Sequence, residues 1–244
     1  MKNYKIIVAY DGTRYKGWQK QGNTKETIQQ KLQDVVSKMC GKEVEVFGSG
    51  RTDAGAHASY QVANFKAKVN LQEQEILEYI NQYLPLDIAV THIEVTGERF
   101  HSRLNAKNKT YVYRLNISSI SNVFEKNFVY QKSINLDVEK MKEASVDLIG
   151  KHDFVAFSSG KKTKKSTIRE IYSIEIVQEN NEVKFIINGS GFLYNMVRII
   201  VGTLIEIGEG SRQNDIKNIL ISKDRQKAGV TIPACGLCLQ KVNY

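Results

Sequence analysis

Residues 44–68, VEVFGSGRTDAGAHASYQVANFKAK, decide the fold class, because two strand-like runs flank a glycine-rich loop. Residues 44–47 and 62–68 are the two strand-like runs. The loop, residues 48–57, has three glycines, which permit positive φ and a close backbone approach to a ligand. A dinucleotide-binding loop would place a glycine where Asp53 stands and would continue into a helix. A strand follows instead, so we do not expect that kind of nucleotide site.

Strand and helix patterns alternate on both sides of this stretch, and they do so twice. In the first half, strands are expected at residues 4–10 and 88–95. Helices are expected from Ile28 to a stop at Gly41, and from Asn70, with Glu73 as its capping partner, to Pro85. In the second half, the expected strands are residues 111–117, 171–177, 183–188 and 237–242. The expected helices there are residues 138–149, ending at Gly150, and a segment that carries residues 192–207.

The pattern repeats without the regular spacing of strand–helix–strand units in a doubly wound fold. We therefore expect an α+β protein of two related α/β subdomains, residues 1–104 and 105–244, with mainly antiparallel sheets and helices on one side. The chain has 35 Lys+Arg against 26 Asp+Glu, a net charge of +9. The second half carries 21 basic and 14 acidic side chains, which favours a polyanion such as nucleic acid as its partner.

No apolar run approaches the roughly 20 residues of a membrane helix, and the N-terminal apolar run is too short for a signal peptide. The sequence therefore predicts no membrane association and a cytoplasmic location. Three cysteines do not form a disulfide framework. Cys235 and Cys238 are spaced like half of a zinc or redox site, but no second pair exists and they fall in an apparent strand, so we interpret them as buried thiols.

Arg51 and Asp53 carry the chemistry that the glycine-rich loop suggests. In a bent loop, the Arg51 guanidinium can meet the Asp53 carboxylate or hold a phosphate beside it. An arginine at that range lowers the pKa of a carboxylate by about 1–3 units and keeps it ionised, as a nucleophile must be. The alternative is a turn in which Asp53 caps loop amides and Arg51 is a surface residue.

The stretch GSGRTDAGAHA, residues 48–58, closely resembles the R-T-D-x-G-x-H-A signature of the tRNA pseudouridine synthase A family, the tRNA pseudouridine(38-40) synthases. Ala56 stands where valine is common. Further similar motifs follow in the family's order along nearly the whole chain: residues 10–13 (YDGT), 17–19 (GWQ), 100–113, 152–154 (HDF), 191–198 (GFLYNMVR) and 233–237.

This resemblance implies two subdomains joined across a central basic cleft. It also implies a homodimer that isomerises uridines 38, 39 and 40 of the tRNA anticodon stem-loop without metal or cofactor. By position, Asp53 is the nucleophile, Tyr111 the active-site aromatic and base, and Arg51 and Arg198 the basic neighbours. The substrate-binding candidates are Tyr111, Arg51, Thr52, His57, Lys161 and Lys162.

Several residues keep a second interpretation. Tyr111 shares a strand face with Tyr113 and could be a core aromatic. The four histidines have no metal-ligand spacing and are expected to pack or to lie at the surface, and His57 could support the loop. Lys161, Lys162, Lys164 and Lys165 suit either a solvated loop or contacts with RNA phosphates.

Two other functions remain open at this point. A non-catalytic RNA-binding module would tolerate replacement of Asp53, although the sequence has no aromatic RNA-recognition motif. A metal-dependent nuclease or phosphotransferase would need carboxylates or histidines clustered near Asp53, and none is near it in sequence.

Overall fold

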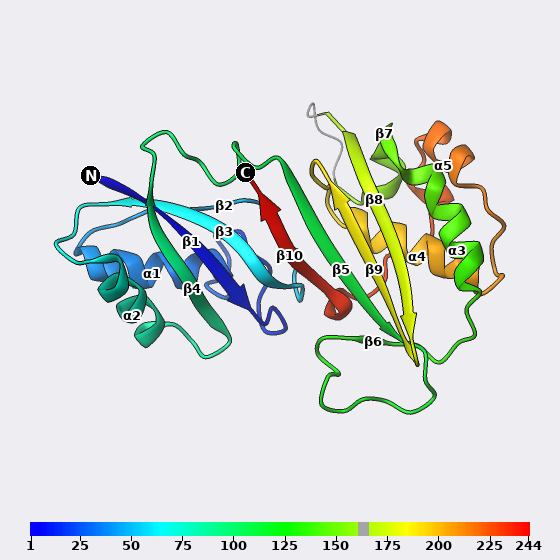
Figure 1. The fold of residues 1–244 in the computed structure, drawn as a ribbon, viewed down its shortest axis with the longest axis horizontal. Helices are drawn as coiled ribbons and strands as arrows, with labels where there is room; N and C mark the ends of the chain where they lie inside the picture. Colours follow the sequence, from blue (N-terminus) through cyan, green and yellow to red (C-terminus); the bar gives the residue numbers. More distant parts are fainter. Residues whose placement is uncertain (161–165) are drawn as a thin grey trace. The chain divides into compact units, whose positions relative to one another are not determined.

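The computed structural model describes residues 1–160 and 166–244 (Figure 1). The chain forms two compact units: unit 1, residues 1–107 with 238–244, and unit 2, residues 108–237. The sequence predicted a division at residue 104, with residues 238–244 in the second half. In the structure these C-terminal residues belong to unit 1. None of the helices in the described part of the chain is long and apolar enough to span a bilayer.

Unit 1 is a sheet with the strand order β4-β1-β3-β10, in which β2 also pairs with β3. The pairings of β1 with β3 and β4, and of β2 with β3, are antiparallel, and β10 runs parallel to β3. The strands are β1 (Lys2–Tyr10), β2 (Val46–Gly48), β3 (His57–Ala67), β4 (Ile88–Thr96) and β10 (Leu237–Asn243). Its helices are α1 (Ile28–Cys40) and α2 (Glu73–Tyr83), which pack on each other.

The ends of the unit 1 helices follow from their caps. Thr27 accepts from the Gln30 N–H at the start of α1, and Gly41 ends the helix with φ +66°, as the sequence predicted. The predicted start of α2 at Asn70 was wrong. Gln72 is the N-cap, and Glu75 completes the capping box by accepting from the Gln72 N–H at 2.7 Å.

The strands of unit 2 follow the order β5-β9-β8-β7 with antiparallel pairing, and β6 pairs parallel with β5. Its strands are β5 (Asn108–Asn116), β6 (Tyr130–Gln131), β7 (Gly150–Asp153), β8 (Ile168–Glu179) and β9 (Glu182–Gly189). Its α-helices are α3 (Val138–Ser145), α4 (Met196–Gly208) and α5 (Ile216–Ser222). Short 3₁₀ turns are η1 (Val146–Leu148), η2 (Phe154–Phe157), η3 (Arg225–Lys227) and η4 (Ala234–Gly236). The α+β class and the mainly antiparallel pairing are confirmed.

Two sequence predictions in unit 2 need correction. Phe192 does not lie on α4, because Asn195 takes the left-handed conformation (φ +61°) and the helix starts only at Met196. Cys235 lies in the η4 turn, not in a strand, and both Cys235 and Cys238 are half-buried.

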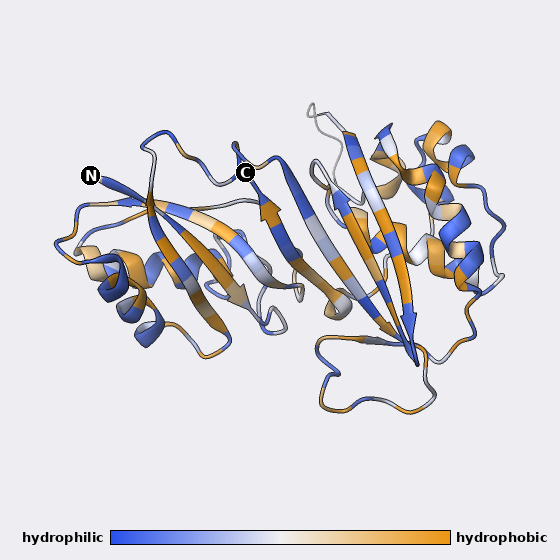
Figure 2. Ribbon diagram, in the orientation of Figure 1, coloured by the Kyte–Doolittle hydropathy of each residue, from blue (hydrophilic) through white to orange (hydrophobic). Residues whose placement is uncertain are grey.

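Hydrophobic and hydrophilic residues alternate along the strands of both units (Figure 2). On β5 this alternation buries Tyr111, Tyr113 and Leu115, at 6%, 0% and 0% exposure. Helix α4 is buried on almost every side and forms the centre of the unit 2 core. It therefore provides a rigid support for the residues at its start.

Candidate active site

The loop between β2 and β3 forms a tight turn at Asp53. The Ala56 N–H donates to the Asp53 carbonyl at 3.1 Å, and Gly55 takes φ +78°, as the third position of a type II turn requires. The Ser49 N–H donates to the Val62 carbonyl at 2.7 Å, which fixes the start of the loop to β3. The turn that bears Asp53 is therefore anchored at both ends.

The segment that follows β1 packs directly against this loop. The Trp18 N–H donates to the Thr52 carbonyl, and the Gly55 N–H donates to the Tyr15 carbonyl, each at 3.2 Å. A Cβ on Gly12 would lie 1.9 Å from the Ala56 oxygen, and one on Gly17, whose φ is +93°, would lie 2.6 Å from the Thr52 oxygen. Only glycine permits so close an approach. This explains the two glycines of the YDGT and GWQ motifs.

Buried side chains also hold the loop from within. The Tyr10 hydroxyl and Thr52 Oγ1 lie 2.8 Å apart, and both residues are buried, at 5% and 6% exposure. Burial raises the pKa of Tyr10 well above its ordinary value, so this hydroxyl stays protonated. The Gln61 amide donates to the Gly50 carbonyl at 3.1 Å and accepts from the Ser49 hydroxyl at 2.6 Å.

His57 ends the loop as a buried side chain, 3% exposed. Its Nδ1 receives the Gly12 N–H at 3.0 Å. Asp11 Oδ1 lies 3.2 Å from the same nitrogen. The structure thus supports the interpretation of His57 as a residue that supports the loop, and its contact with a substrate stays a prediction.

The two charged residues of the loop differ in exposure. Arg51 is exposed, and its Nε donates to Gln19 Oε1 at 3.1 Å, while Asp53 is half-buried. Gln19 is in turn fixed by Gln29 of α1, through a bond of 2.6 Å between their side-chain amides. The guanidinium is therefore oriented by unit 1 itself, and sequence reasoning had no signal for Gln19 as its partner.

In unit 2, Tyr111 lies on β5, opposite Ile187 of β9. The Phe192 ring meets its ring edge-on, with 5.2 Å between the centroids. Tyr113, on the same strand face, donates its hydroxyl to the Pro233 carbonyl at 2.8 Å and belongs to the core. Tyr111 is itself buried, at 6% exposure, as the core interpretation of this residue expects, and its role in the reaction stays a prediction.

Arg198, in the first turn of α4, is held by two neutral oxygens. Its Nε donates to the Ile232 carbonyl and its Nη1 donates to Asn195 Oδ1, both at 2.7 Å. The carbonyl of Ile232 is placed by the segment that follows η3, which runs along α4. A Cβ on Gly202 would lie only 2.1 Å from the Val230 oxygen, which shows how closely this segment approaches the helix.

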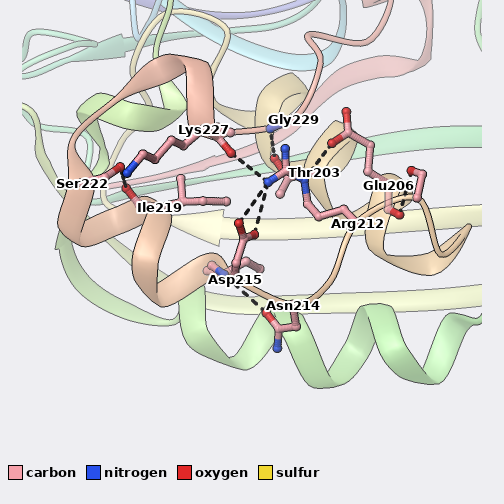
Figure 3. A network of polar contacts seen from close by, with 12 residues as sticks. Thr203, Glu206, Arg212, Asn214, Asp215, Ile219, Ser222, Lys227 and Gly229 are labelled. Atoms are coloured by element: carbon pink, nitrogen blue, oxygen red, sulfur yellow. Dashed lines mark hydrogen bonds and ion pairs between the residues drawn. The ribbon is translucent and has the colours of Figure 1, made fainter.

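Figure 3 shows the polar network that fixes this segment. The Gly229 N–H donates to Thr203 Oγ1 at 2.9 Å. The Val230 N–H donates to Glu206 Oε1 at 2.8 Å. Arg212 bonds the other Glu206 oxygen at 2.9 Å and the Lys227 carbonyl at 2.8 Å. This network therefore fixes the segment whose Ile232 carbonyl holds Arg198.

The candidate residues thus fall into two local groups. Arg51, Thr52, Asp53 and His57 share one loop of unit 1, while Tyr111 and Arg198 belong to unit 2. Lys161 and Lys162 lie outside the described residues. Within residues 1–160 and 166–244, no group of three or more His, Cys, Asp or Glu side chains could hold a metal ion. Tyr10, Gln61 and Asn195 also support the site. Tyr10 and Asn195 lie in the YDGT and GFLYNMVR motifs, which assigned them no role, and no motif contains Gln61.

Comparisons with known proteins identify the family. The family model described as tRNA pseudouridine synthase matches residues 6–105 and 144–244. Proteins named tRNA pseudouridine synthase A 2 from Bacillus anthracis and tRNA pseudouridine synthase A 1 from Clostridium tetani are each 46% identical, over the whole of both chains. A chain of a solved Cbf5-Nop10-Gar1 complex is 13% identical, and the match covers 85% of this chain and 43% of that one. The TM-score of this match is 0.36, which is too low to support a structural conclusion. The matches at the level of sequence show that this chain belongs to the tRNA pseudouridine synthase family.

Proposed function

We propose that this protein converts uridines 38, 39 and 40 of the tRNA anticodon stem-loop to pseudouridine, with Asp53 as the nucleophile. Its family comprises tRNA-modifying isomerases, and tRNA is the substrate class that their names give. The choice of the anticodon stem-loop rests on the RTDAGAH motif of residues 51–57. We place the activity in the cytoplasm, where tRNA is modified.

The observation that carries this proposal is the rigid turn that presents Asp53. Two glycines without room for a Cβ, Gly12 and Gly17, and the buried Tyr10–Thr52 hydrogen bond fix the backbone on either side of it. A carboxylate on a fixed turn loses little freedom when the reaction begins, which lowers the entropic part of the barrier. A loop that merely linked two strands would not need such close packing.

The reaction is an isomerisation whose atoms balance without a second substrate. The N1–C1′ glycosidic bond breaks, the uracil turns over, and a C5–C1′ bond forms. C5 then loses its proton and N1 gains one. The Asp53 carboxylate acts at C1′, by adding to it or by assisting loss of the base. If it adds, its bond to C1′ breaks when the C5–C1′ bond forms, which regenerates the carboxylate. The target uridine must first leave its stack, at a cost of a few kcal/mol.

We assign the supporting roles to Tyr111, Arg51 and Arg198. The Tyr111 ring stacks on the displaced uracil and its oxygen removes the C5 proton, while the edge-on contact with Phe192 holds the ring in place. Arg51 and Arg198 favour the ionised forms of the groups that react. Both guanidiniums already have neutral partners that orient them, Gln19 Oε1 for Arg51 and the Ile232 carbonyl for Arg198.

We further propose that the protein is a homodimer and that residues 117–129 contribute to its interface. In this loop Ile120, Val123 and Phe124 are 79%, 65% and 93% exposed. The loop is fixed to the sheet by Arg114, which pairs with Glu125 at 3.1 Å and with Glu182 at 2.7 Å. Monomeric proteins rarely expose so many large apolar side chains together, so a second copy of the chain is a suitable cover.

The test uses tRNA transcripts tritiated at uridine C5, with uridines at positions 38, 39 and 40. The proposal predicts release of tritium to water, and mapping of the products should place pseudouridine at those positions only. Modification confined to another arm of the tRNA would contradict the choice of the anticodon arm. For the dimer, Phe124→Glu should lower the mass measured by light scattering, and the same change at the exposed Ile168 of β8 is the control.

A further inference from the structure

We propose that Asn195 is a positioning residue for the reaction, because its side-chain amide holds the Arg198 guanidinium and is held in turn by Ser159. Asn195 Oδ1 accepts from Arg198 Nη1 at 2.7 Å, and Asn195 Nδ2 donates to Ser159 Oγ at 2.5 Å. The inference rests on the proposed function, in which Arg198 acts on the substrate.

The chemistry of the partners fixes which way this amide points. A guanidinium only donates hydrogen bonds, so the atom that faces Arg198 must be the amide oxygen. The NH₂ group then faces the Ser159 hydroxyl, which accepts. This position needs a short side chain that accepts one hydrogen bond and donates another in a fixed plane. Asparagine is the smallest residue with such a side chain.

Helix capping does not account for Asn195. An asparagine just before a helix usually takes an extended conformation, and its side chain accepts a backbone N–H of the first turn. Asn195 instead has φ +61°, and its oxygen is engaged with Arg198. Asparagine tolerates this left-handed conformation better than most residues do. At this position an asparagine side chain would ordinarily cap the helix. Here it holds Arg198 instead.

Ser159 is itself fixed by the backbone next to Asn195. The Tyr194 carbonyl accepts from the Ser159 N–H and from the Ser158 hydroxyl, each at 3.3 Å. The Gly160 N–H donates to the same Ser158 hydroxyl at 3.2 Å. These bonds join residues 158–160 to the start of α4, so the Ser159 hydroxyl is in place to hold the Asn195 amide.

The neutrality of the amide also matters. The Ile232 carbonyl and the Asn195 amide, which both orient Arg198, are themselves uncharged. An aspartate at position 195 would keep an acceptor for the guanidinium but would place a negative charge beside it. We therefore expect Asn195→Asp to fold and to hold Arg198, yet to slow turnover by weakening the positive charge that Arg198 offers to the substrate.

The main test compares Asn195→Gly with Asn180→Gly. Glycine accepts a positive φ, so each change keeps the backbone and removes only the amide. Asn180 has φ +53° in the turn between β8 and β9 and serves as the matched control. For Asn195→Gly, kcat for tritium release should fall roughly 10- to 100-fold, the range expected for one hydrogen bond to a charged group, with tRNA affinity within about twofold of wild type. Asn180→Gly should behave as wild type.

A second set of variants separates positioning from a general structural role. In an Arg198→Ala background, measured in single turnovers with excess enzyme, Asn195→Gly should cause no further loss, because it acts through Arg198. Equal losses in both backgrounds would overturn the inference, as would wild-type activity of Arg198→Ala. Should Asn195→Gly fail to fold, Ser159→Ala tests the same chain of bonds and should show a smaller loss that also disappears in Arg198→Ala.

The outcomes for the two proposals are distinguishable. If the wild-type protein releases no tritium from any tRNA, the proposed function fails, and this inference fails with it. If the wild type is active and Asn195→Gly matches it in kcat and affinity, only the role of Asn195 is overturned.

Discussion

The buried bond between Tyr10 and Thr52 allows a quantitative test of how the Asp53 loop is held. Tyr10→Phe removes one hydroxyl and leaves Thr52 Oγ1 buried, where the described part of the chain offers it no other partner. Thr52→Val keeps the shape of the side chain, and the Gln61 side chain stays near the Tyr10 hydroxyl. The double variant leaves neither residue with an unpaired oxygen at this contact.

The expected losses follow from these partners. A buried polar group without a partner costs about 1–3 kcal/mol, so Tyr10→Phe should lower the free energy of unfolding by about 2 kcal/mol. Thr52→Val should cost about 1 kcal/mol, because the polar Gln61 side chain remains near the Tyr10 hydroxyl. The double variant should also cost only about 1–1.5 kcal/mol. The coupling free energy between the two hydroxyls is then about 1.5 kcal/mol, well above the roughly 0.5 kcal/mol error of additivity.

The assay is urea unfolding of the four proteins, with the free energies combined in a double-mutant cycle. Tritium release by Thr52→Val adds a second measurement. If Thr52 acts only within the loop, the KM of this variant for tRNA should equal that of the wild type. Additive losses would refute the account of Tyr10 and Thr52 as one buried pair. A large rise in KM with unchanged stability would assign Thr52 to the substrate instead.

Three further outcomes are expected. Tyr111→Phe keeps the ring and its edge-on contact with Phe192, so tRNA binding should persist while C5-tritium release is largely lost; unimpaired release would assign the base to another group. Replacing Lys161, Lys162, Lys164 and Lys165 together by Ala should flatten the salt dependence of tRNA binding by roughly 0.7–0.9 in log–log slope for each phosphate that the variant no longer neutralises, and an unchanged slope would favour a solvated loop. The hydrogen bond from Thr167, with Lys223, lowers the pKa of Asp153, so this carboxylate stabilises the fold above about pH 4 and loses that effect as the pH falls further. In urea unfolding, Asp153→Asn should lower the free energy of unfolding by about 0.5 kcal/mol at pH 7 and should leave it unchanged at pH 2. An equal loss at both pH values would contradict the pKa shift.

Local patterns in the sequence predicted most elements of the fold. The apolar spacing from Ile28 to Met39 and the glycine at position 41 identified α1 and its end, because capping depends on neighbouring residues. The alternation of Tyr111, Tyr113 and Leu115 identified β5 for a similar local reason. The starts of α2 and α4 were missed. At α2 two capping patterns compete within a few residues, and at α4 the left-handed Asn195 interrupts an apolar pattern that looks continuous.

Long-range packing could not be predicted in the same way. The glycine-rich loop and its charged residues were evident from residues 48–57 alone. The approach of Gly12 to Ala56, the Tyr10–Thr52 bond and the place of β10 beside β3 join residues far apart in the chain, and no periodicity reports them. For the same reason, His57 could be recognised as a loop residue, but its acceptor role toward Gly12 could not.

Replacement of Asp53 tests the central claim most directly. Asp53→Asn keeps the size of the side chain and the turn, since the Ala56 N–H bonds the backbone carbonyl of residue 53. Asp34→Asn on the exposed side of α1 is the matched control. Both variants should bind tRNA as the wild type does, and Asp34→Asn should release C5 tritium at the wild-type rate. Asp53→Asn should release none, because a neutral amide cannot act as the ionised nucleophile. Release at a rate near that of the wild type would contradict the claim.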